Sequence, residues 1–185
     1  MFEAQKKREM RFTIFIAAAA LIGITTLAEG QTIYEHNYLV KVGDTAPDFT
    51  VNEAGGKTYR LSDLRGKVVM LQFTASWCGV CRKEMPFIEE EIWIPGKKQG
   101  LAVIGIDRDE PVETVRKFAS DMKITYPLAL DPGAGIFGLF AEKQAGVTRN
   151  VIIDRNGKII FLTRLFERDE FDEMQKIIFT ELAIK

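Results

Sequence analysis

The chain has 185 residues, of which 46% are hydrophobic, and it carries a formal net charge of −1. This length suggests one domain that buries a core without disulfide staples. The composition argues against a disordered chain and lacks the strong basic excess of a typical nucleic-acid binder. Two cysteines and one histidine are too few for a structural zinc site, which usually takes four ligands, so we expect neither a metal nor another cofactor.

The N-terminal segment 1–30 has the order of a secretory signal. Residues 12–28 contain no charge, and they follow the basic residues Lys6, Lys7, Arg8 and Arg11. Small residues then offer a cleavage site at Ala28-Glu29-Gly30, with Thr26-Leu27-Ala28 as a competitor. Cleavage is the favoured interpretation, although the run 12–28 is also just long enough to remain as a membrane anchor.

In both cases the basic flank stays cytoplasmic, so the rest of the chain is expected on the far side of the membrane. We therefore predict a periplasmic protein, exported by a cleavable signal peptide or held at the inner membrane by an uncleaved anchor. Residues 31–41 are expected to form a linker, and residues 42–185 a single domain.

Along residues 42–185, predicted strands alternate with predicted helices. Apolar runs and turn residues indicate strands at 49–51, 58–61, 68–73, 101–107, 126–130, 151–154 and 158–162. Apolar residues at helical spacing indicate helices over 77–93, 112–122 and 136–144, and a last helix that buries Phe171, Met174, Ile178 and Leu182. This order of elements predicts an α/β fold with a mixed sheet.

The segment Trp77-Cys78-Gly79-Val80-Cys81 follows a predicted buried strand and opens a predicted helix. A helix N-terminus presents unpaired N–H groups and a partial positive charge, which stabilise the thiolate that attacks disulfides. Cys78 is therefore expected to be the exposed nucleophile. Cys81 is expected to be the buried resolving thiol, because it shares an apolar stripe with Met85, Ile88 and Ile92. A purely structural disulfide would stabilise the fold by only about 2 kcal/mol over so short a loop, so redox chemistry is favoured.

These residues resemble the TlpA/ResA branch of the thioredoxin superfamily. The resemblance covers about residues 42–182 and rests on four motifs: Gly43-Asp44-x-Ala46-Pro47-Asp48-Phe49, Leu61-Ser62-Asp63-Leu64-Arg65-Gly66-Lys67, Ala75-Ser76-Trp77-Cys78-x-x-Cys81-Arg82-Lys83-Glu84-Met85-Pro86 and Ile153-Asp154-Arg155-Asn156-Gly157-Lys158. It implies a thioredoxin-like fold, with a mixed central sheet flanked by helices, an N-terminal hairpin and a central TlpA-type insertion between residues 107 and 131. Members typically reduce disulfides of exported proteins, including apocytochrome c during haem attachment, and a membrane electron carrier re-reduces them.

The resemblance also implies roles for single residues. Glu84 matches the family's carboxylate three positions after the second cysteine. Such a group, partly buried one turn beyond Cys81, has a raised pKa and can exchange a proton with the resolving thiol; a solvated surface glutamate is the alternative. Pro86 matches a proline that kinks this helix. The surface that binds substrate is expected to comprise Trp77, Gly79, Val80, Thr148 and Arg149. Trp77 is expected to pack beside the sulfurs, and an ordinary core aromatic is the alternative.

Two positions depart from the pattern. Gln72 stands where cytosolic thioredoxins keep a buried aspartate, and an amide cannot accept that residue's proton. Thr148 stands where the family has a cis-proline that faces the cysteines. A cis bond before a non-proline residue costs about 2.5–4 kcal/mol, so the Val147–Thr148 peptide is expected to be strained or trans. Arg149 either adds positive charge near Cys78 or faces solvent.

The sequence therefore predicts a monomeric thiol–disulfide oxidoreductase that reduces exported proteins and receives electrons from a membrane thiol donor. A disulfide oxidase or isomerase is the first alternative. A thiol peroxidase is less favoured because Ala75 stands where peroxiredoxins have threonine or serine. A non-catalytic thioredoxin-like domain that binds a partner or copper is the third alternative; copper carriers of this fold usually add a late histidine, and none follows His36.

Overall fold

The computed structural model describes residues 34–184. The predicted signal segment 1–30, with its candidate membrane anchor at 12–28 and its cleavage sites, lies outside the described residues. Residues 31–33 of the expected linker lie outside them as well. Within residues 34–184, no helix combines the length and the apolar character that crossing a membrane requires.

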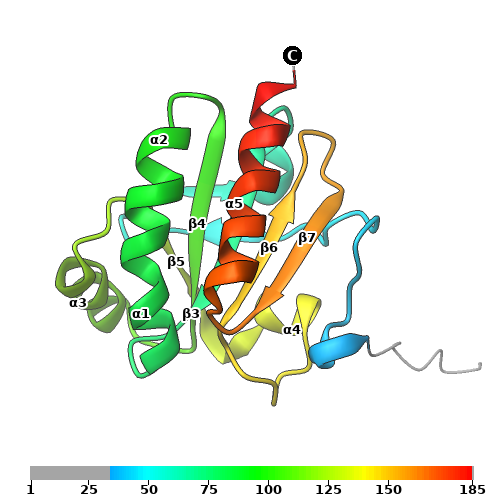
Figure 1. Cartoon of the computed structure of the whole chain (residues 1–185). Coiled ribbons are helices and arrows are strands. Elements are labelled where there is room, and N and C mark those ends of the chain that lie inside the picture. The colour runs from blue at the N-terminus through cyan, green and yellow to red at the C-terminus, as the bar shows by residue number, and fades with distance from the viewer. Residues whose placement is uncertain (1–33, 185) are drawn as a thin grey trace, which may run out of the picture. The chain divides into compact units, whose positions relative to one another are not determined.

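A mixed sheet with the strand order β5-β4-β3-β6-β7 forms the centre of the domain (Figure 1). Its strands are β3 (Val68–Thr74), β4 (Leu101–Arg108), β5 (Leu128–Asp131), β6 (Arg149–Ile153) and β7 (Ile159–Arg164). β3, β4 and β5 run parallel, whereas β6 is antiparallel to both β3 and β7. Every residue of β3 and β6 is buried, because elements cover both faces of the sheet. The predicted mixed α/β fold is confirmed.

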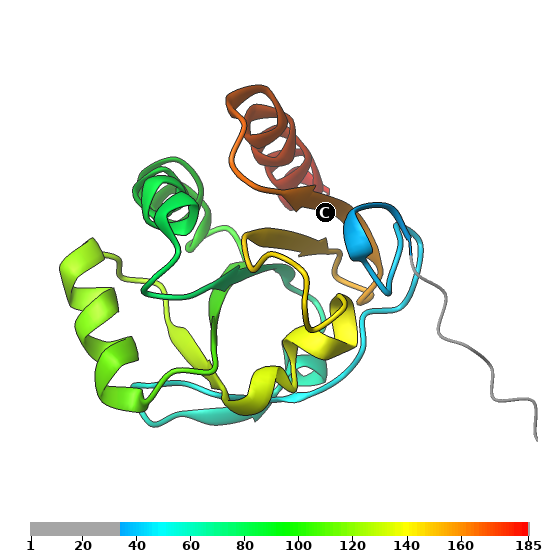
Figure 2. The same ribbon diagram turned by 90° about the horizontal axis from the view of Figure 1, so that it is seen from below.

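The two faces of the sheet carry different elements (Figure 2). One face packs against α1 (Gly79–Phe87), α3 (Val112–Met122) and α5 (Arg168–Ala183), with Met85, Phe118 and Met174 in the shared core. The other face packs against the hairpin of β1 (Thr50–Asn52) and β2 (Thr58–Arg60), the 3-10 turns Leu61–Leu64 and Pro132–Ala134, and α4 (Phe137–Phe140). The predicted hairpin and the elements between residues 107 and 131 are present.

The long helix expected at 77–93 begins at Gly79 and continues to Gly96, and it consists of three segments. α1 ends at Phe87, a π-helix spans Ile88–Trp93, and the short α2 covers Ile94–Gly96. Pro86 lies inside α1 and has no N–H to donate, and prolines and π-turns are common causes of a bend in a helix. The helix expected at 136–144 is shorter than predicted, because Ala141 adopts an extended conformation and pairs with Tyr38.

Residues 34–41, expected as part of a linker, lie against the domain. Tyr38 and Val40 are buried, and the backbone N–H of Leu39 donates to the carbonyl of Phe140 at 2.8 Å. The Tyr38 hydroxyl donates to the carbonyl of Thr163, at the end of β7, over 2.6 Å. These contacts make residues 34–41 part of the packed domain.

Candidate active site

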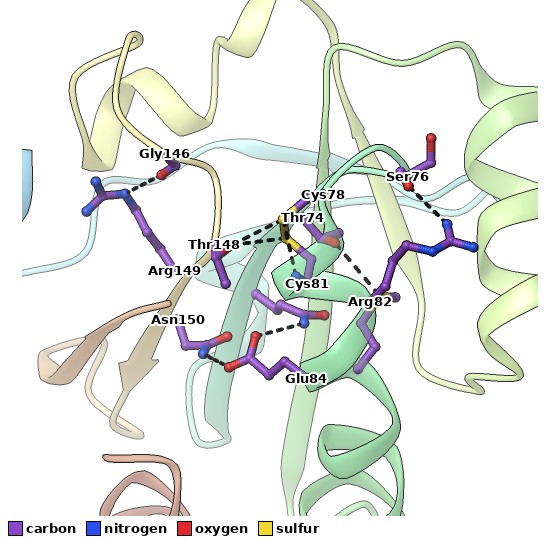
Figure 3. The surroundings of a disulfide bond; sticks show 12 residues. Thr74, Ser76, Cys78, Cys81, Arg82, Glu84, Gly146, Thr148, Arg149 and Asn150 are labelled. Atoms are coloured by element: carbon purple, nitrogen blue, oxygen red, sulfur yellow. Dashed lines mark hydrogen bonds between the residues drawn. A yellow bond between two sulfur atoms is a disulfide. The ribbon is translucent and has the colours of Figure 1, made fainter. Parts of the chain in front are cut away.

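The two cysteines lie at the point where β3 gives way to α1. Cys78 is the N-cap of α1, and its Sγ accepts the backbone N–H of Cys81 at 3.2 Å. Cys78 and Cys81 are joined by a disulfide (Figure 3). An N-cap sulfur faces the unpaired N–H groups and the positive end of the helix dipole, so this position favours a thiolate when the bond is reduced.

The exposure of the site differs from the sequence-based expectation. Cys81 is fully buried, as expected, but Cys78 is only 8% exposed rather than open to solvent. Trp77 is 65% exposed, which excludes the alternative of an ordinary core aromatic. Gly79 is exposed and Val80 is half-buried. Trp77 lines a hollow of about 430 Å³ together with Gly146 and Val147.

Thr148 comes from the loop before β6 and faces the disulfide from the side opposite α1 (Figure 3). Its Oγ1 lies 3.2 Å from the Sγ of Cys78 and 3.3 Å from the Sγ of Cys81. No peptide bond in the described part of the chain is cis, so the Val147–Thr148 peptide is trans. The Thr148 carbonyl accepts the N–H of Leu165 at 3.2 Å, which ties the loop to the end of β7.

Glu84 lies one turn along α1 from Cys81 and is 1% exposed, which excludes the alternative of a solvated surface glutamate. Its Oε1 accepts a hydrogen bond from the Nδ2 of Asn150 at 2.6 Å, and its Oε2 accepts one from the Nε2 of Gln72 at 3.3 Å. Burial raises the pKa of Glu84 to about 7, although the two amide hydrogen bonds oppose this rise. A carboxyl group with such a pKa both accepts and donates protons near neutral pH.

The comparisons with known proteins agree with this geometry. Residues 42–162 match the AhpC/TSA family. The chain is 33% identical over 155 residues to the thiol-disulfide oxidoreductase ResA of Geobacillus thermodenitrificans, covering 84% of this chain and 86% of that protein. The chain belongs to the AhpC/TSA family and is a ResA-like thiol–disulfide oxidoreductase. The resemblance drawn from the motifs is thus confirmed.

Two solved structures share the fold of this oxidoreductase. A protein of Bacteroides thetaiotaomicron, provisionally named a protein disulfide isomerase, is 58% identical with a TM-score of 0.77, over 79% of this chain and 92% of that one. A protein of Chlorobium tepidum, provisionally named thiol:disulfide interchange protein DsbE, is 30% identical with a TM-score of 0.70, over 78% of this chain and 99% of that one.

Arg149 of the oxidoreductase neither faces solvent nor approaches Cys78. It is 1% exposed, and its guanidinium turns away from the disulfide (Figure 3). Its Nε donates to the carbonyl of Gly146 at 3.0 Å and its Nη2 to the carbonyl of His36 at 2.6 Å, while the group stacks 4.5 Å above the ring of Tyr38. Both sequence-based interpretations of Arg149 were wrong, because the side chain anchors residues 36–38 to β6.

Sequence reasoning named Gln72 only as a departure from the family pattern, and it missed that Gln72 and Asn150 both donate hydrogen bonds to Glu84. Asn150 pairs with Gln72 in the register of β3 and β6, so both amides lie on the face that α1 covers. The Oε1 of Gln72 also accepts the hydroxyl of Tyr126 at 2.8 Å, and the Nδ2 of Asn150 donates to the Oγ1 of Thr163 at 2.9 Å. The one available signal was the presence of single amides within otherwise apolar strands, since buried polar groups are usually hydrogen-bonded.

A second buried carboxyl group lies near the loop that carries Cys78. Asp107, in β4 opposite Thr74 of β3, is fully buried, and neither of its oxygens has a hydrogen-bond donor within residues 34–184. Burial first, and then the charge of Glu110, raise the pKa of Asp107 to about 8. Glu110 in turn accepts the backbone N–H of Ser76 at 2.5 Å and its hydroxyl at 2.6 Å.

Proposed function

We propose that this oxidoreductase reduces disulfides of exported proteins, with Cys78 as the attacking thiol and Cys81 as the resolving thiol. The observation that carries the proposal is the asymmetry of the pair. Cys78 caps the helix and retains 8% of its surface, whereas Cys81 is fully buried and lies one turn from the buried carboxyl group of Glu84. Of the two cysteines, only Cys78 keeps any exposed surface, so we assign the attack on substrate to Cys78.

The reaction would begin with attack of the Cys78 thiolate on a substrate disulfide. The Cys78 sulfur bonds to one substrate sulfur, and the other substrate sulfur leaves as a thiolate that takes a proton from water. Cys81 then loses its proton to the Glu84 carboxylate and attacks the Cys78 sulfur. The mixed disulfide breaks, the substrate leaves with both sulfurs reduced, and the protein is left with the Cys78–Cys81 disulfide.

Glu84 suits the role of proton acceptor for Cys81 because both of its hydrogen-bond donors, Gln72 and Asn150, are neutral amides rather than cations. A carboxylate paired with a cation would stay ionised near neutral pH and could not return a proton when the protein is reduced again. The pKa of about 7 lets Glu84 exchange a proton in either direction at neutral pH.

The proposal includes export. Residues 1–30 would serve as a signal peptide or, through 12–28, as an anchor, and the domain, including residues 34–41, would work as a monomer in the periplasm. Since that compartment is oxidising, a reductant there needs a partner that restores its dithiol, and a membrane thiol donor fits this need. Apocytochrome c is one substrate that would fit, because its thiols must be reduced before haem is attached.

The decisive experiment combines the reduction potential of the cysteine pair with insulin reduction. We expect a potential near that of thioredoxin, about −270 mV, and insulin turnover that Cys78→Ser abolishes. Cys81→Ser should instead accumulate a mixed disulfide with the substrate. A potential near that of DsbA, about −120 mV, would reverse the direction, and retained turnover in Cys78→Ser would overturn the assignment of the nucleophile.

Disulfide isomerisation is the second candidate. It is favoured by the provisional name of the solved Bacteroides thetaiotaomicron protein, which is 58% identical to this chain. An isomerase supplied with its cysteine pair reduced would restore activity to scrambled ribonuclease at catalytic concentration with no further reductant, whereas a reductase would need a stoichiometric electron donor.

A further inference from the structure

We propose that the hydroxyl group of Thr148 is a catalytic hydrogen-bonding group that donates to the Cys78 thiolate and accepts from the Cys81 thiol. This inference rests on the proposed function, since it gives Thr148 a part in the same dithiol reaction. The Oγ1 of Thr148 lies 3.2 Å from one sulfur and 3.3 Å from the other. No other residue donates to or accepts from both sulfurs through its side chain within residues 34–184.

The hydroxyl group is held at the sulfurs by its surroundings. Thr148 is 4% exposed and Val147 is 3% exposed, so water does not compete freely for the hydroxyl. The Thr148 carbonyl is bonded to the N–H of Leu165, and Arg149 is fixed in β6 by its contacts with Gly146 and His36. The loop is therefore tied on both sides of the hydroxyl-bearing residue.

The chemistry of a hydroxyl group matches the reduced pair. A threonine hydroxyl has one proton to donate and two lone pairs that accept. With Cys78 as thiolate and Cys81 as thiol, the Thr148 proton points to Cys78 and the Cys81 S–H points to the Thr148 oxygen. The Cys78 thiolate would then have two donors, the Thr148 hydroxyl and the backbone N–H of Cys81, which already lies at 3.2 Å.

The hydroxyl distinguishes the two redox states because a thiolate is a far better acceptor than a disulfide sulfur. When the disulfide takes up two electrons and one proton, the S–S bond breaks, Cys78 becomes a thiolate and Cys81 a thiol. The proton of Thr148 stays on Thr148 throughout. Thr148 therefore stabilises the reduced state and raises the thiolate fraction of Cys78, a role that the nearby cation Arg149 does not fill because it is turned away.

The test compares Thr148→Val, which removes the hydroxyl at nearly constant shape, with Thr148→Ser, which keeps it. The readouts are the pH midpoint of Cys78 alkylation by iodoacetamide in the reduced protein and the equilibrium constant with glutathione. For Thr148→Val we expect the midpoint to rise by about one pH unit. We also expect the equilibrium constant for reduction to fall about tenfold, which is about 30 mV. Thr148→Ser should stay close to wild type.

Thr58→Val, the same chemical change on the exposed hairpin strand β2, is the matched control and should change neither readout. Thr148→Ala replaces Thr148→Val should the latter not fold. Equal midpoints and equal equilibrium constants in wild type and in the variant without the hydroxyl would overturn the inference. A wild-type protein that does not reduce insulin would instead overturn the proposed direction, and the alkylation midpoint would still test Thr148.

Discussion

Gln72 of β3 and Asn150 of β6 face each other across the sheet, and both donate an amide hydrogen to the same buried carboxyl group, that of Glu84. Glu84 thus has neutral partners on two neighbouring strands of the sheet that α1 covers. Neutral donors limit the rise of its pKa without holding the group permanently ionised, as a cation would. The hydrogen bonds from Gln72 and Asn150 therefore leave Glu84, one turn from Cys81, suited to proton exchange.

Glu84→Gln keeps the shape of the side chain but removes the group that titrates. We expect the resolution of the mixed disulfide at pH 7 to slow by about a hundredfold, the lower end of what a positioned acid or base contributes. The pH dependence of that step should also lose its inflection near 7. Rapid-mixing measurements of substrate release between pH 5 and 9 would check both, and an unchanged pH profile in Glu84→Gln would contradict the role.

Asn150→Leu removes the shorter of the two amide hydrogen bonds to Glu84. Since that bond favours the ionised form, its loss should raise the pKa of Glu84 and move the inflection of the resolving step to higher pH. Asn52→Leu, which removes an exposed amide on the hairpin, is the control and should leave the inflection in place. A shift of the inflection to lower pH in Asn150→Leu would mean that the Asn150 amide does not stabilise the ionised form of Glu84.

Burial makes the stability of the fold depend on pH in a predictable direction. The pKa values of Glu84 and Asp107 are raised to about 7 and about 8 in the folded state, so the folded protein binds more protons than the unfolded chain between about pH 4 and pH 8. Stability should therefore increase as pH falls through this window. For Glu84 alone the full change is of the order of 3 kcal/mol.

Urea unfolding of the oxidised protein at pH 5, 7 and 9 measures this dependence. Glu84→Gln and Asp107→Asn should each flatten it and should be more stable than wild type at pH 9. A wild-type protein whose free energy of unfolding increases from pH 5 to pH 9 would show that other groups dominate the titration.

Arg149→Met tests the structural role of the buried arginine. The variant leaves the carbonyls of Gly146 and His36 without their donor, and we expect a loss of about 2–4 kcal/mol in the free energy of unfolding. The pH midpoint of Cys78 alkylation should stay within a few tenths of wild type, because the guanidinium is directed away from the sulfurs. A large shift of that midpoint with little loss of stability would restore the electrostatic role first expected from the sequence.

The elements and the cysteine pair could be predicted from the sequence because they depend on local patterns. Apolar spacing gave the bounds of α3 at 112–122, in agreement with the structure, and apolar runs located β3 and β4. Helical spacing also placed Cys81 and Met85 on the buried side of α1. Such patterns repeat within a few residues along the chain, so they need no knowledge of tertiary contacts.

The surroundings of the disulfide were decided only by the tertiary structure. The hydroxyl of Thr148 reaches Cys78 across 70 positions of sequence, and Asn150 meets Gln72 because of the register between β3 and β6. A shift of that register by one residue would turn both amides to the opposite face of the sheet. The sequence by itself therefore determined a cysteine pair at the N-terminus of a helix. Strand pairing decided that Thr148 contacts the sulfurs of Cys78 and Cys81, and that the amides of Gln72 and Asn150 donate hydrogen bonds to Glu84.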